Sequence, residues 1–374
     1  MDQIQHKYIE VNGLKLHVAE IGTGPSVVVF LHGFPEIWYT WRYQMSAVAK
    51  AGYRAIAPDY RGYGLSDPPP EPEKASFSDL ITDLEGILDA LSIPKAFLVG
   101  KDFGAPVAYQ FALLHPERVS GVVTLGVPFM QAQIPAHHKQ LPEGFYVSRW
   151  KEPGRAEADF GHLDAKTVVR NIYILFSKSE IPIAGENQEI MDLVEPTTPL
   201  PPWFTEEDLA AYGALYEKSG FQTALQVPYR ALHEASTTTD PKVEAPALLI
   251  MGEKDYVFAF AGMEEYIRSG QVKVYVPNLE ITYLPEGSHF VHEQFPDQIV
   301  KNTMHQSLAV GCICCFRPAE ELKMSERGLG GPKGASDNAQ SYWFGWQKTM
   351  GQGPIMVLME PKGMGPILEW FKTR

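Results

Sequence analysis

The sequence predicts an α/β fold in which a mostly parallel sheet is flanked by helices and interrupted by a helical insertion. Short apolar runs rich in Val and Ile alternate with segments of helical periodicity, which is typical of strand–helix–strand crossovers. This alternation stops near Pro128 and resumes after Pro246. With 374 residues, the chain is long enough for one large α/β domain that carries an inserted second one.

Strands are expected where an apolar run is short, continuous and bounded by turn residues. Six runs meet this description: Ser26–Leu31, Tyr53–Ala57, Ala96–Val99, Val119–Leu125, Ala247–Met251 and Val272–Val276. Between them, the apolar residues from Leu84 to Leu91 have the i, i+3, i+4, i+7 spacing of one helix face. A second helix is predicted over Val107–His115, where Pro116 ends it. Strand, helix and strand in this order predict a parallel sheet.

The segment from Phe129 to about Glu234 contains no strand-like run. It has helical patterns over Val168–Ser177 and Glu206–Glu217, and a proline-rich stretch at Thr197–Pro202. We therefore predict a core of residues 1–128 and 236–300, with a helical lid, or cap domain, of residues 129–235. Because the insertion follows a strand, it is expected to cover the carboxyl edge of the sheet, where open α/β sheets bind ligands.

Residues 301–374 differ in character from the rest of the chain. They carry 9 Lys and Arg against 6 Asp and Glu, a net charge of +3, so the first 300 residues carry −16. This segment holds half of the methionines and shows no sustained apolar period. We predict a divergent, poorly ordered C-terminal extension.

The composition excludes several classes of protein. The net charge of −13 argues against a nucleic acid or an anionic membrane as partner. No apolar run approaches the ~20 residues that a membrane span needs, and Met1–Gly13 lacks the basic and apolar regions of a secretory signal. All three cysteines lie in the last fifth of the chain, so the first 300 residues are expected to fold without disulfides, as suits a reducing cytosol.

An acidic residue follows the third predicted strand, in the sequence GKDFG of residues 100–104. This spacing is that of a nucleophile elbow, a sharp strand-to-helix turn that exposes a reactive side chain and needs small neighbours. Asp102 occupies the reactive position, and a carboxylate there can form an ester that a second step hydrolyses. The alternative is that Asp102 caps the following helix. The chain contains no Gly-x-Ser-x-Gly, so a serine nucleophile has no candidate.

The loop after the first predicted strand reads His32-Gly33-Phe34-Pro35. The backbone N–H of Phe34 is a candidate for one half of an oxyanion hole, and the N–H of Phe103, directly after Asp102, for the other half. The alternative is a tight turn that contains a structural histidine.

Two further ionisable residues follow strands, which places them at the same edge of the sheet. Asp255 ends the sequence MGEKD of residues 251–255, and His289 ends EGSH of residues 286–289. The chain order of nucleophile, acid and histidine is that of a catalytic triad. Taken singly, Asp255 as a helix cap and His289 as a solvated loop residue are the simpler interpretations. All the motifs together, in order and each after a strand, favour catalysis.

From Tyr8 to Val300, about four fifths of the chain, the sequence resembles the α/β-hydrolase fold and, within it, the soluble epoxide hydrolases, most of all the plant members. The motifs that carry this resemblance are HGFPE at 32–36, APDYRGYGLS at 57–66, GKDFG at 100–104, GEKD at 252–255 and GSHF at 287–290. Two tyrosines match the family's epoxide-binding pair. Tyr146 precedes the segment Lys151–Glu157, and Tyr229 lies in Pro228-Tyr229-Arg230.

The resemblance implies a hydrolase without metal or cofactor that converts small lipophilic epoxides to vicinal diols with water. The implied catalytic residues are Asp102, Asp255, His289, Tyr146 and Tyr229. Phe34 and Phe103 would supply oxyanion-hole N–H groups, and Phe34, Pro35 and Phe103 would contact substrate. Fatty-acid epoxides or aryl oxiranes are the implied substrates. We expect a cytoplasmic protein, with the peroxisome as the alternative, and the resemblance leaves room for a homodimer.

The sequence departs from the family pattern on both sides of Asp102. Most relatives have His before and Trp after the nucleophile, where this chain has Lys101 and Phe103. The backbone N–H of residue 103 is kept, but the wall of the pocket differs, which puts substrate preference in doubt. Pro228, before the second tyrosine, also differs from the commonest form and removes a backbone donor.

Two other functions use the same fold. A haloacid or haloalkane dehalogenase shares the Asp nucleophile, but the haloacid-cleaving relatives have arginines just after it, where this chain has Phe103–Pro106. A non-catalytic protein that binds an apolar ligand under the lid is the second. The set of five catalytic residues argues against it.

Overall fold

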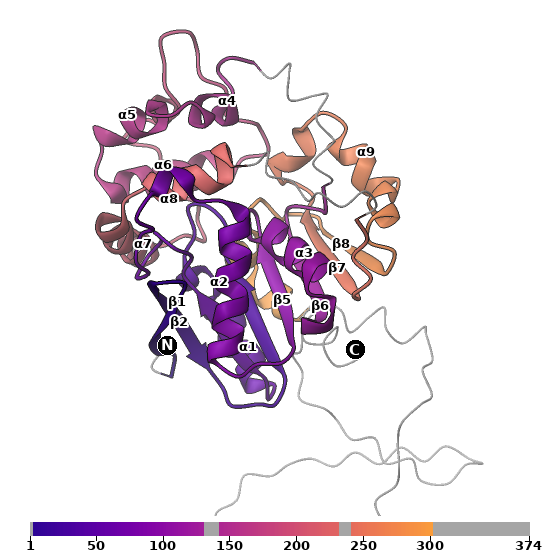
Figure 1. Ribbon diagram of the computed structural model, residues 1–374. Coiled ribbons are helices and arrows are strands. Elements are labelled where there is room, and N and C mark those ends of the chain that lie inside the picture. The colour runs from indigo at the N-terminus through magenta and orange to yellow at the C-terminus, as the bar shows by residue number, and fades with distance from the viewer. Residues whose placement is uncertain (1–2, 131–141, 232–240, 302–374) are drawn as a thin grey trace, which may run out of the picture. The chain divides into compact units, whose positions relative to one another are not determined.

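The computed structural model describes residues 3–130, 142–231 and 241–301, and the predicted extension from residue 302 onward lies outside them. Its centre is an eight-stranded sheet in the order β1-β2-β4-β3-β5-β6-β7-β8 (Figure 1). The strands are β1 Gln5–Val11, β2 Leu14–Ile21, β3 Val27–Leu31, β4 Arg54–Pro58, β5 Ala96–Lys101, β6 Val119–Leu125, β7 Ala247–Gly252 and β8 Leu279–Leu284. The β1–β2 and β2–β4 pairs are antiparallel, and the other neighbouring strands are parallel.

Helices connect the strands. Outside the insertion they are α1 Arg42–Lys50, α2 Phe77–Ala90, α3 Gly104–Leu114, α9 Met263–Arg268, α10 Val291–Gln294 and α11 Pro296–Lys301. Between β6 and β7 they are α4 Tyr146–Lys151, α5 Arg155–Gly161, α6 Ala165–Phe176, α7 Glu206–Ser219, α8 Gln222–Leu225 and the π-helical turn η6 Gln226–Arg230. Single 3₁₀ turns are η1 Trp38–Trp41, η2 Pro72–Lys74, η3 Pro116–Arg118, η5 Met191–Leu193, η7 Tyr256–Ala259 and η8 Gln271–Val274. Within the described ranges, no helix is long and apolar enough to cross a bilayer.

Five of the six predicted strands correspond to β3–β7, but the prediction of a strand at Val272–Val276 was wrong. That run forms the turn η8, and the last strand is β8, Leu279–Leu284. Val272 and Val276 are fully buried, whereas Val274 between them is 63% exposed. Buried positions four residues apart are those of a helical face, and Pro277 follows directly, so the run does not alternate as a strand does.

The alternation of side chains along the central strands divides the core into two clusters, one on each face of the sheet. In β3, Val28 and Phe30 pack in a cluster with Met45 and Val48 of α1. The neighbouring Val29 and Leu31 belong to a cluster that contains α2, α3 and the insertion. Because parallel strands are covered on both faces, these runs are apolar throughout.

The inserted helices lie at one end of the sheet (Figure 1). The ring of Tyr229 lies 5.7 Å from Phe34, after β3, and 5.4 Å from Phe103, after β5. These contacts place the insertion over the carboxyl edge, as the sequence analysis expects. The residue limits of core and lid stay predictions, because residue 235 lies outside the described ranges.

The turn between β5 and α3 is tightly packed. Asp102 has a left-handed backbone, with φ of +51°, which is strained for any residue except glycine. A Cβ atom on Gly104 would lie 2.1 Å from the carbonyl oxygen of Leu31, and one on Gly100 would lie 2.4 Å from that of Gly104. The glycines of the GKDFG sequence therefore allow β3, β5 and α3 to approach closely enough to form the turn.

We expect Gly104→Ala to lower the free energy of unfolding by about 3 kcal/mol, because the added methyl group overlaps backbone atoms that have no space to move. Urea unfolding followed by circular dichroism measures the change. Gly161→Ala is the matched control, since a Cβ there meets nothing within 4 Å. It should leave stability unchanged or raise it by up to about 1 kcal/mol. Equal stability of the two variants would contradict the steric argument.

Candidate functional site

Asp102 lies at the carboxyl end of the sheet with its carboxylate buried beside the loop that follows β3. Its Oδ1 accepts a hydrogen bond from the N–H of Phe34 at 3.2 Å, and the N–H of Phe103 also donates to this carboxylate. A Cβ on Gly33 would lie 2.5 Å from the Cβ of Asp102, so only glycine allows the two loops to be this close. Two backbone donors from different strand ends therefore converge on one carboxylate.

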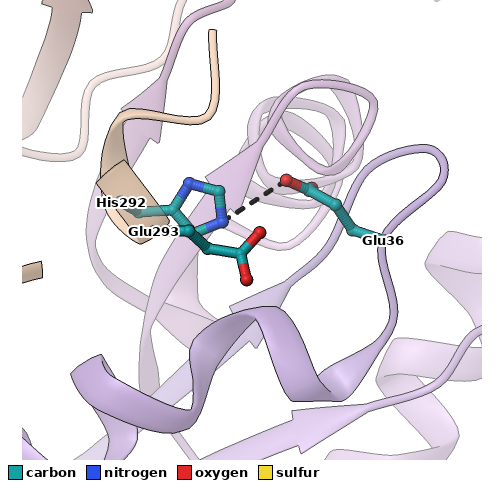
Figure 2. A group of neighbouring side chains, drawn as sticks. All are labelled: Glu36, His292 and Glu293. Carbon is teal, nitrogen blue, oxygen red and sulfur yellow. Dashed lines mark ion pairs between the residues drawn. The ribbon is translucent and has the colours of Figure 1, made fainter. Parts of the chain in front are cut away.

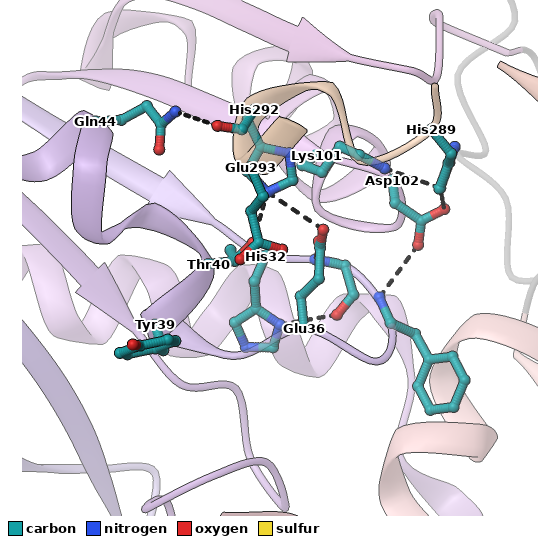
Figure 3. Close-up of polar contacts among 12 residues, drawn as sticks. His32, Glu36, Tyr39, Thr40, Gln44, Lys101, Asp102, His289, His292 and Glu293 are labelled. Atoms are coloured by element: carbon teal, nitrogen blue, oxygen red, sulfur yellow. Dashed lines mark hydrogen bonds and ion pairs between the residues drawn. The ribbon is translucent and has the colours of Figure 1, made fainter. Parts of the chain in front are cut away.

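His289 lies between Asp102 and a second carboxylate. Its Nδ1 is 3.0 and 3.1 Å from the two carboxylate oxygens of Asp255. Its Nε2 is 3.2 Å from Oδ2 of Asp102 (Figure 3). Asp255 also accepts the N–H of Val257 at 3.0 Å, which fixes its orientation. The structure thus brings together three residues that are 187 and 34 positions apart in the chain.

Both predicted tyrosines of the insertion are buried and face the strand ends. Tyr146 begins α4 and Tyr229 lies in the π-helical turn η6, and their ring centres are 6.2 Å apart. The hydroxyl of Tyr146 lies 3.3 Å from that of Tyr256, the residue after Asp255. The two phenols come from different inserted helices, and Tyr229 lines the same pocket as Asp102.

A small pocket connects Asp102, His289 and Tyr229. The residues that line it are Phe34, Asp102, Ile172, Phe176, Tyr229, Tyr256, His289 and Phe290. Apart from one carboxylate, one imidazole and two phenols, the wall is apolar. Three residues that the sequence analysis expects to contact substrate are not among those that line the pocket: Pro35, Phe103 and Tyr146. Pro35 and Phe103 are adjacent to lining residues in the chain, and Tyr146 contacts the lining residue Tyr256 through its hydroxyl.

The site is buried, and burial is the largest influence on its charges. Burial raises the pKa of Asp102, but the hydrogen bond with His289 and the ammonium of Lys101 outweigh it, so that the pKa lies below its usual value. Burial lowers the pKa of His289, the charge of Asp255 raises it, and the net shift is upward. Burial raises the pKa of Tyr146 and of Tyr229 well above the usual value, so both phenols keep their protons.

Lys101 is the residue before Asp102, and its side chain is fully buried. Its Nζ lies 2.8 Å from Nε2 of His289, and 5.6 Å from the centre of the Phe290 ring. A buried ammonium is unfavourable unless it is hydrogen-bonded. Here its partner is the same imidazole nitrogen that faces Asp102.

A second buried polar cluster lies behind the pocket and contains Glu36, His292 and Glu293 (Figure 2). Nε2 of His292 is 3.3 Å from Oε1 of Glu36, whose Oε2 accepts the N–H of Gly33 at 2.8 Å. Glu293 is bound by Arg42 at 2.6 Å. The ligand atoms of the cluster lie within 4.8 Å of one another, but a guanidinium already neutralises Glu293, so the arrangement fits support of the Gly33 loop better than a cation site.

Sequence reasoning missed several residues of the pocket. Tyr256 follows Asp255 directly, so its position in the chain was a usable signal. Ile172 and Phe176 come from one face of α6, and only their spacing of four residues hinted that they face the same way. The sequence analysis noted Lys101 as a departure from the family pattern, but its contact with His289 depends on a loop that is distant in the chain.

Comparison with known proteins supports the resemblance to the epoxide hydrolases of the α/β-hydrolase fold. The family model described as alpha/beta hydrolase fold matches residues 26–296. "Epoxide hydrolase 3" from Siraitia grosvenorii is 38% identical over 309 residues, which are 80% of this chain and 96% of that protein. "Epoxide hydrolase A" from Mycobacterium tuberculosis is 33% identical over 308 residues, 78% of this chain and 94% of that protein.

Two solved epoxide hydrolase structures are similar to this chain as well. The crystal structure of an epoxide hydrolase from Vigna radiata has a TM-score of 0.75 with 36% identity, covering 80% of this chain and 96% of that one. The structure of potato epoxide hydrolase I has a TM-score of 0.71 with 35% identity, covering 79% of this chain and 96% of that one.

The buried carboxyl of Glu36 gives a test of the cluster through the pH dependence of stability. Burial raises the pKa of Glu36 to about 7, although Lys101 opposes the shift. The folded protein therefore binds this proton more tightly than the unfolded chain, and the resulting stabilisation is complete below about pH 4.5 and is lost as the pH rises to about 7.

We expect the free energy of unfolding of Glu36→Gln, relative to the original protein, to rise by on the order of 2 kcal/mol between pH 5 and pH 8. Gln keeps the acceptor for Gly33 but does not ionise. Urea unfolding at several pH values measures the difference, with Glu217→Gln at an exposed position of α7 as the control. A difference between variant and original that does not change with pH would show that Glu36 is ionised throughout.

Proposed function

The chain belongs to the epoxide hydrolases of the α/β-hydrolase fold, and on that basis we propose that it converts apolar epoxides to vicinal diols through an ester on Asp102. The observation that carries the proposal is the arrangement around one carboxylate. The N–H of Phe34 binds Oδ1, and the imidazole of His289 faces Oδ2. Tyr229 of the lid lines the same pocket, and its ring centre lies 6.2 Å from that of Tyr146.

In the first step, Oδ2 of Asp102 attacks an epoxide carbon. Oδ1 accepts the N–H of Phe34, whereas Oδ2 faces the imidazole of His289 and is the oxygen that we assign to the attack. The carbon–oxygen bond of the strained ring breaks, and its electron pair stays on the ring oxygen. The low pKa of Asp102 keeps the carboxylate ionised and hence nucleophilic over the working pH range.

The ring oxygen needs a proton donor as the carbon is attacked. Tyr146 and Tyr229 are buried phenols that keep their protons, and the ring of Tyr229 contacts Phe34 and Phe103 on either side of Asp102. Donors that are fixed before the reaction stabilise charge at little reorganisation cost. The two phenols therefore hold the epoxide oxygen, and one of them transfers its proton to the developing alkoxide.

In the second step, Nε2 of His289 takes a proton from water, and the water oxygen bonds to Cγ of Asp102. Asp255 holds Nδ1–H and stabilises the imidazolium that forms. The negative charge on the carbonyl oxygen is bound by the N–H groups of Phe34 and Phe103. Collapse of this intermediate breaks the bond from Cγ to the diol oxygen, which takes the proton held by Nε2 of His289. The proton that remains on the Asp102 carboxyl compensates for the one that the phenol transferred in the first step, so the carboxylate and both phenols are restored.

The wall formed by Phe34, Ile172, Phe176 and Phe290 fits a lipophilic substrate. Fatty-acid epoxides and aryl oxiranes, the classes that the resemblance implies, both meet this description. Action in the cytoplasm and assembly as a homodimer stay predictions from the sequence.

A single turnover in H₂¹⁸O, with enzyme in excess over styrene oxide, tests the ester. We expect no label in the first diol, because its new oxygen comes from Asp102, and label in the Asp102 carboxylate, detected by mass spectrometry of the peptide. Asp102→Ala should be folded and inactive. Label that enters the diol in the first turnover would refute the mechanism, and halide release without epoxide turnover would identify a dehalogenase.

Tyr146→Phe and Tyr229→Phe should each lower kcat/KM for epoxides by about tenfold to a hundredfold, because each removes one donor to the ring oxygen. Stopped-flow measurement of diol formation gives the rates. Tyr109→Phe is the matched control, since its buried hydroxyl bonds to Thr124 at 2.9 Å, away from the pocket. If all three variants react at similar rates, the lid phenols have no part in ring opening.

A further inference from the structure

Lys101 places a positive charge against the base of the proposed mechanism. Its side chain has no exposed surface, and its Nζ lies 2.8 Å from Nε2 of His289 (Figure 3). A charged lysine has hydrogen-bond donors and no acceptor. For Lys101 to donate at this distance, Nε2 must offer a lone pair and carry no proton.

The contact with Asp102 requires the opposite protonation state of the same nitrogen. Its Oδ2 lies 3.2 Å from Nε2, and a carboxylate only accepts, so this contact requires a proton on Nε2. One ring nitrogen can satisfy only one of these neighbours at a time. Lys101 and Asp102 therefore compete for the protonation state of His289.

The balance between them changes during the reaction. In the free enzyme His289 lies between the carboxylates of Asp102 and Asp255, and two negative charges favour the imidazolium, which cannot accept a proton. Once Asp102 is esterified, one of these charges is gone, while the ammonium of Lys101 stays in place. The lone pair on Nε2 is then favoured in the step that needs a base, and the proton that Nε2 releases passes to the phenolate left by ring opening.

We propose that Lys101 is a positioning residue that holds Nε2 of His289 in its proton-accepting form while the ester is hydrolysed. The inference rests on the proposed function. The ammonium donates to Nε2 in the newly formed ester, and Nδ1–H stays on Asp255. A water molecule then replaces the ammonium as donor to Nε2, gives up its proton there, and its oxygen bonds to Cγ of Asp102.

The other titratable groups near His289 do not supply a positive charge in place of the Lys101 ammonium. The ring centre of Tyr256 lies 4.8 Å from that of His289, and burial raises the pKa of its phenol well above the usual value, so it is neutral. Burial lowers the pKa of His292 well below its usual value, so it is neutral as well. Glu36, whose carboxyl has a pKa of about 7, adds negative charge when it ionises. Lys101 also lowers the pKa of His289 by its charge.

The test compares Lys101→Met with the original enzyme on one epoxide, with the ester on Asp102 quantified by acid quench and intact-mass measurement. The expected result is a slower second step only: the ester accumulates, kcat and KM fall together by about tenfold, and kcat/KM stays within about twofold. The acid limb of the kcat–pH profile should move up by about one pH unit, because His289 loses its proton less readily without the cation.

Lys254→Met is the matched control. Lys254 also precedes a predicted catalytic acid, Asp255, but it is exposed and paired with Glu286. It should leave kcat, KM and the pH profile unchanged. Lys101→Gln keeps a hydrogen-bond donor without the charge, and it supplies the same pH comparison where the Met variant does not fold.

An unshifted pH profile in a folded variant at position 101 would overturn the inference, as would a fall in kcat/KM without accumulation of ester. These outcomes concern Lys101 alone. Failure of the original enzyme to form any ester on Asp102 would instead refute the proposed function.

Discussion

The close approach of two backbone segments, the turn after β5 and the loop after β3, is the constraint on which the site depends. Asp102 adopts a left-handed backbone there, and Gly33 packs so tightly against it that a methyl group would overlap its Cβ. This contact brings the N–H of Phe34 to Oδ1 of Asp102. Strain in the backbone is thus tolerated where it places a carboxylate against fixed donors, which agrees with the clustering of such strain at functional sites.

The electrostatics of the site follow from its burial. A carboxylate in a dry pocket would become protonated unless opposite charge and hydrogen bonds supported its ionised form. Backbone N–H groups, His289 and Lys101 provide that support. The same burial keeps the phenols of Tyr146 and Tyr229 protonated. One physical condition therefore prepares both an ionised carboxylate and neutral proton donors, which are the two kinds of group that opening an epoxide requires.

The sequence allowed the central parallel strands and the order of the motifs to be predicted, because buried parallel strands are continuous apolar runs that end in glycine-rich turns. It did not lead us to the β1–β2 hairpin, although Asn12 and Gly13 both have positive φ and form a favoured turn pair. β1 is a half-exposed edge strand, and β2, although mostly buried, carries Lys15, His17 and Glu20, so neither is a continuous apolar run. The contact of Lys101 with His289 was missed for another reason: it joins distant parts of the chain, and no local pattern encodes such a distance.

Phe34 contacts both the carboxylate of Asp102 and the inserted helices. Its N–H binds the carboxylate of Asp102, while its ring packs against Trp150, Phe221 and Tyr229 of the inserted helices. An outward displacement of those helices would remove ring contacts from the residue whose amide supports the carboxylate. The packing of the inserted helices and the support of Asp102 are therefore joined through a single side chain.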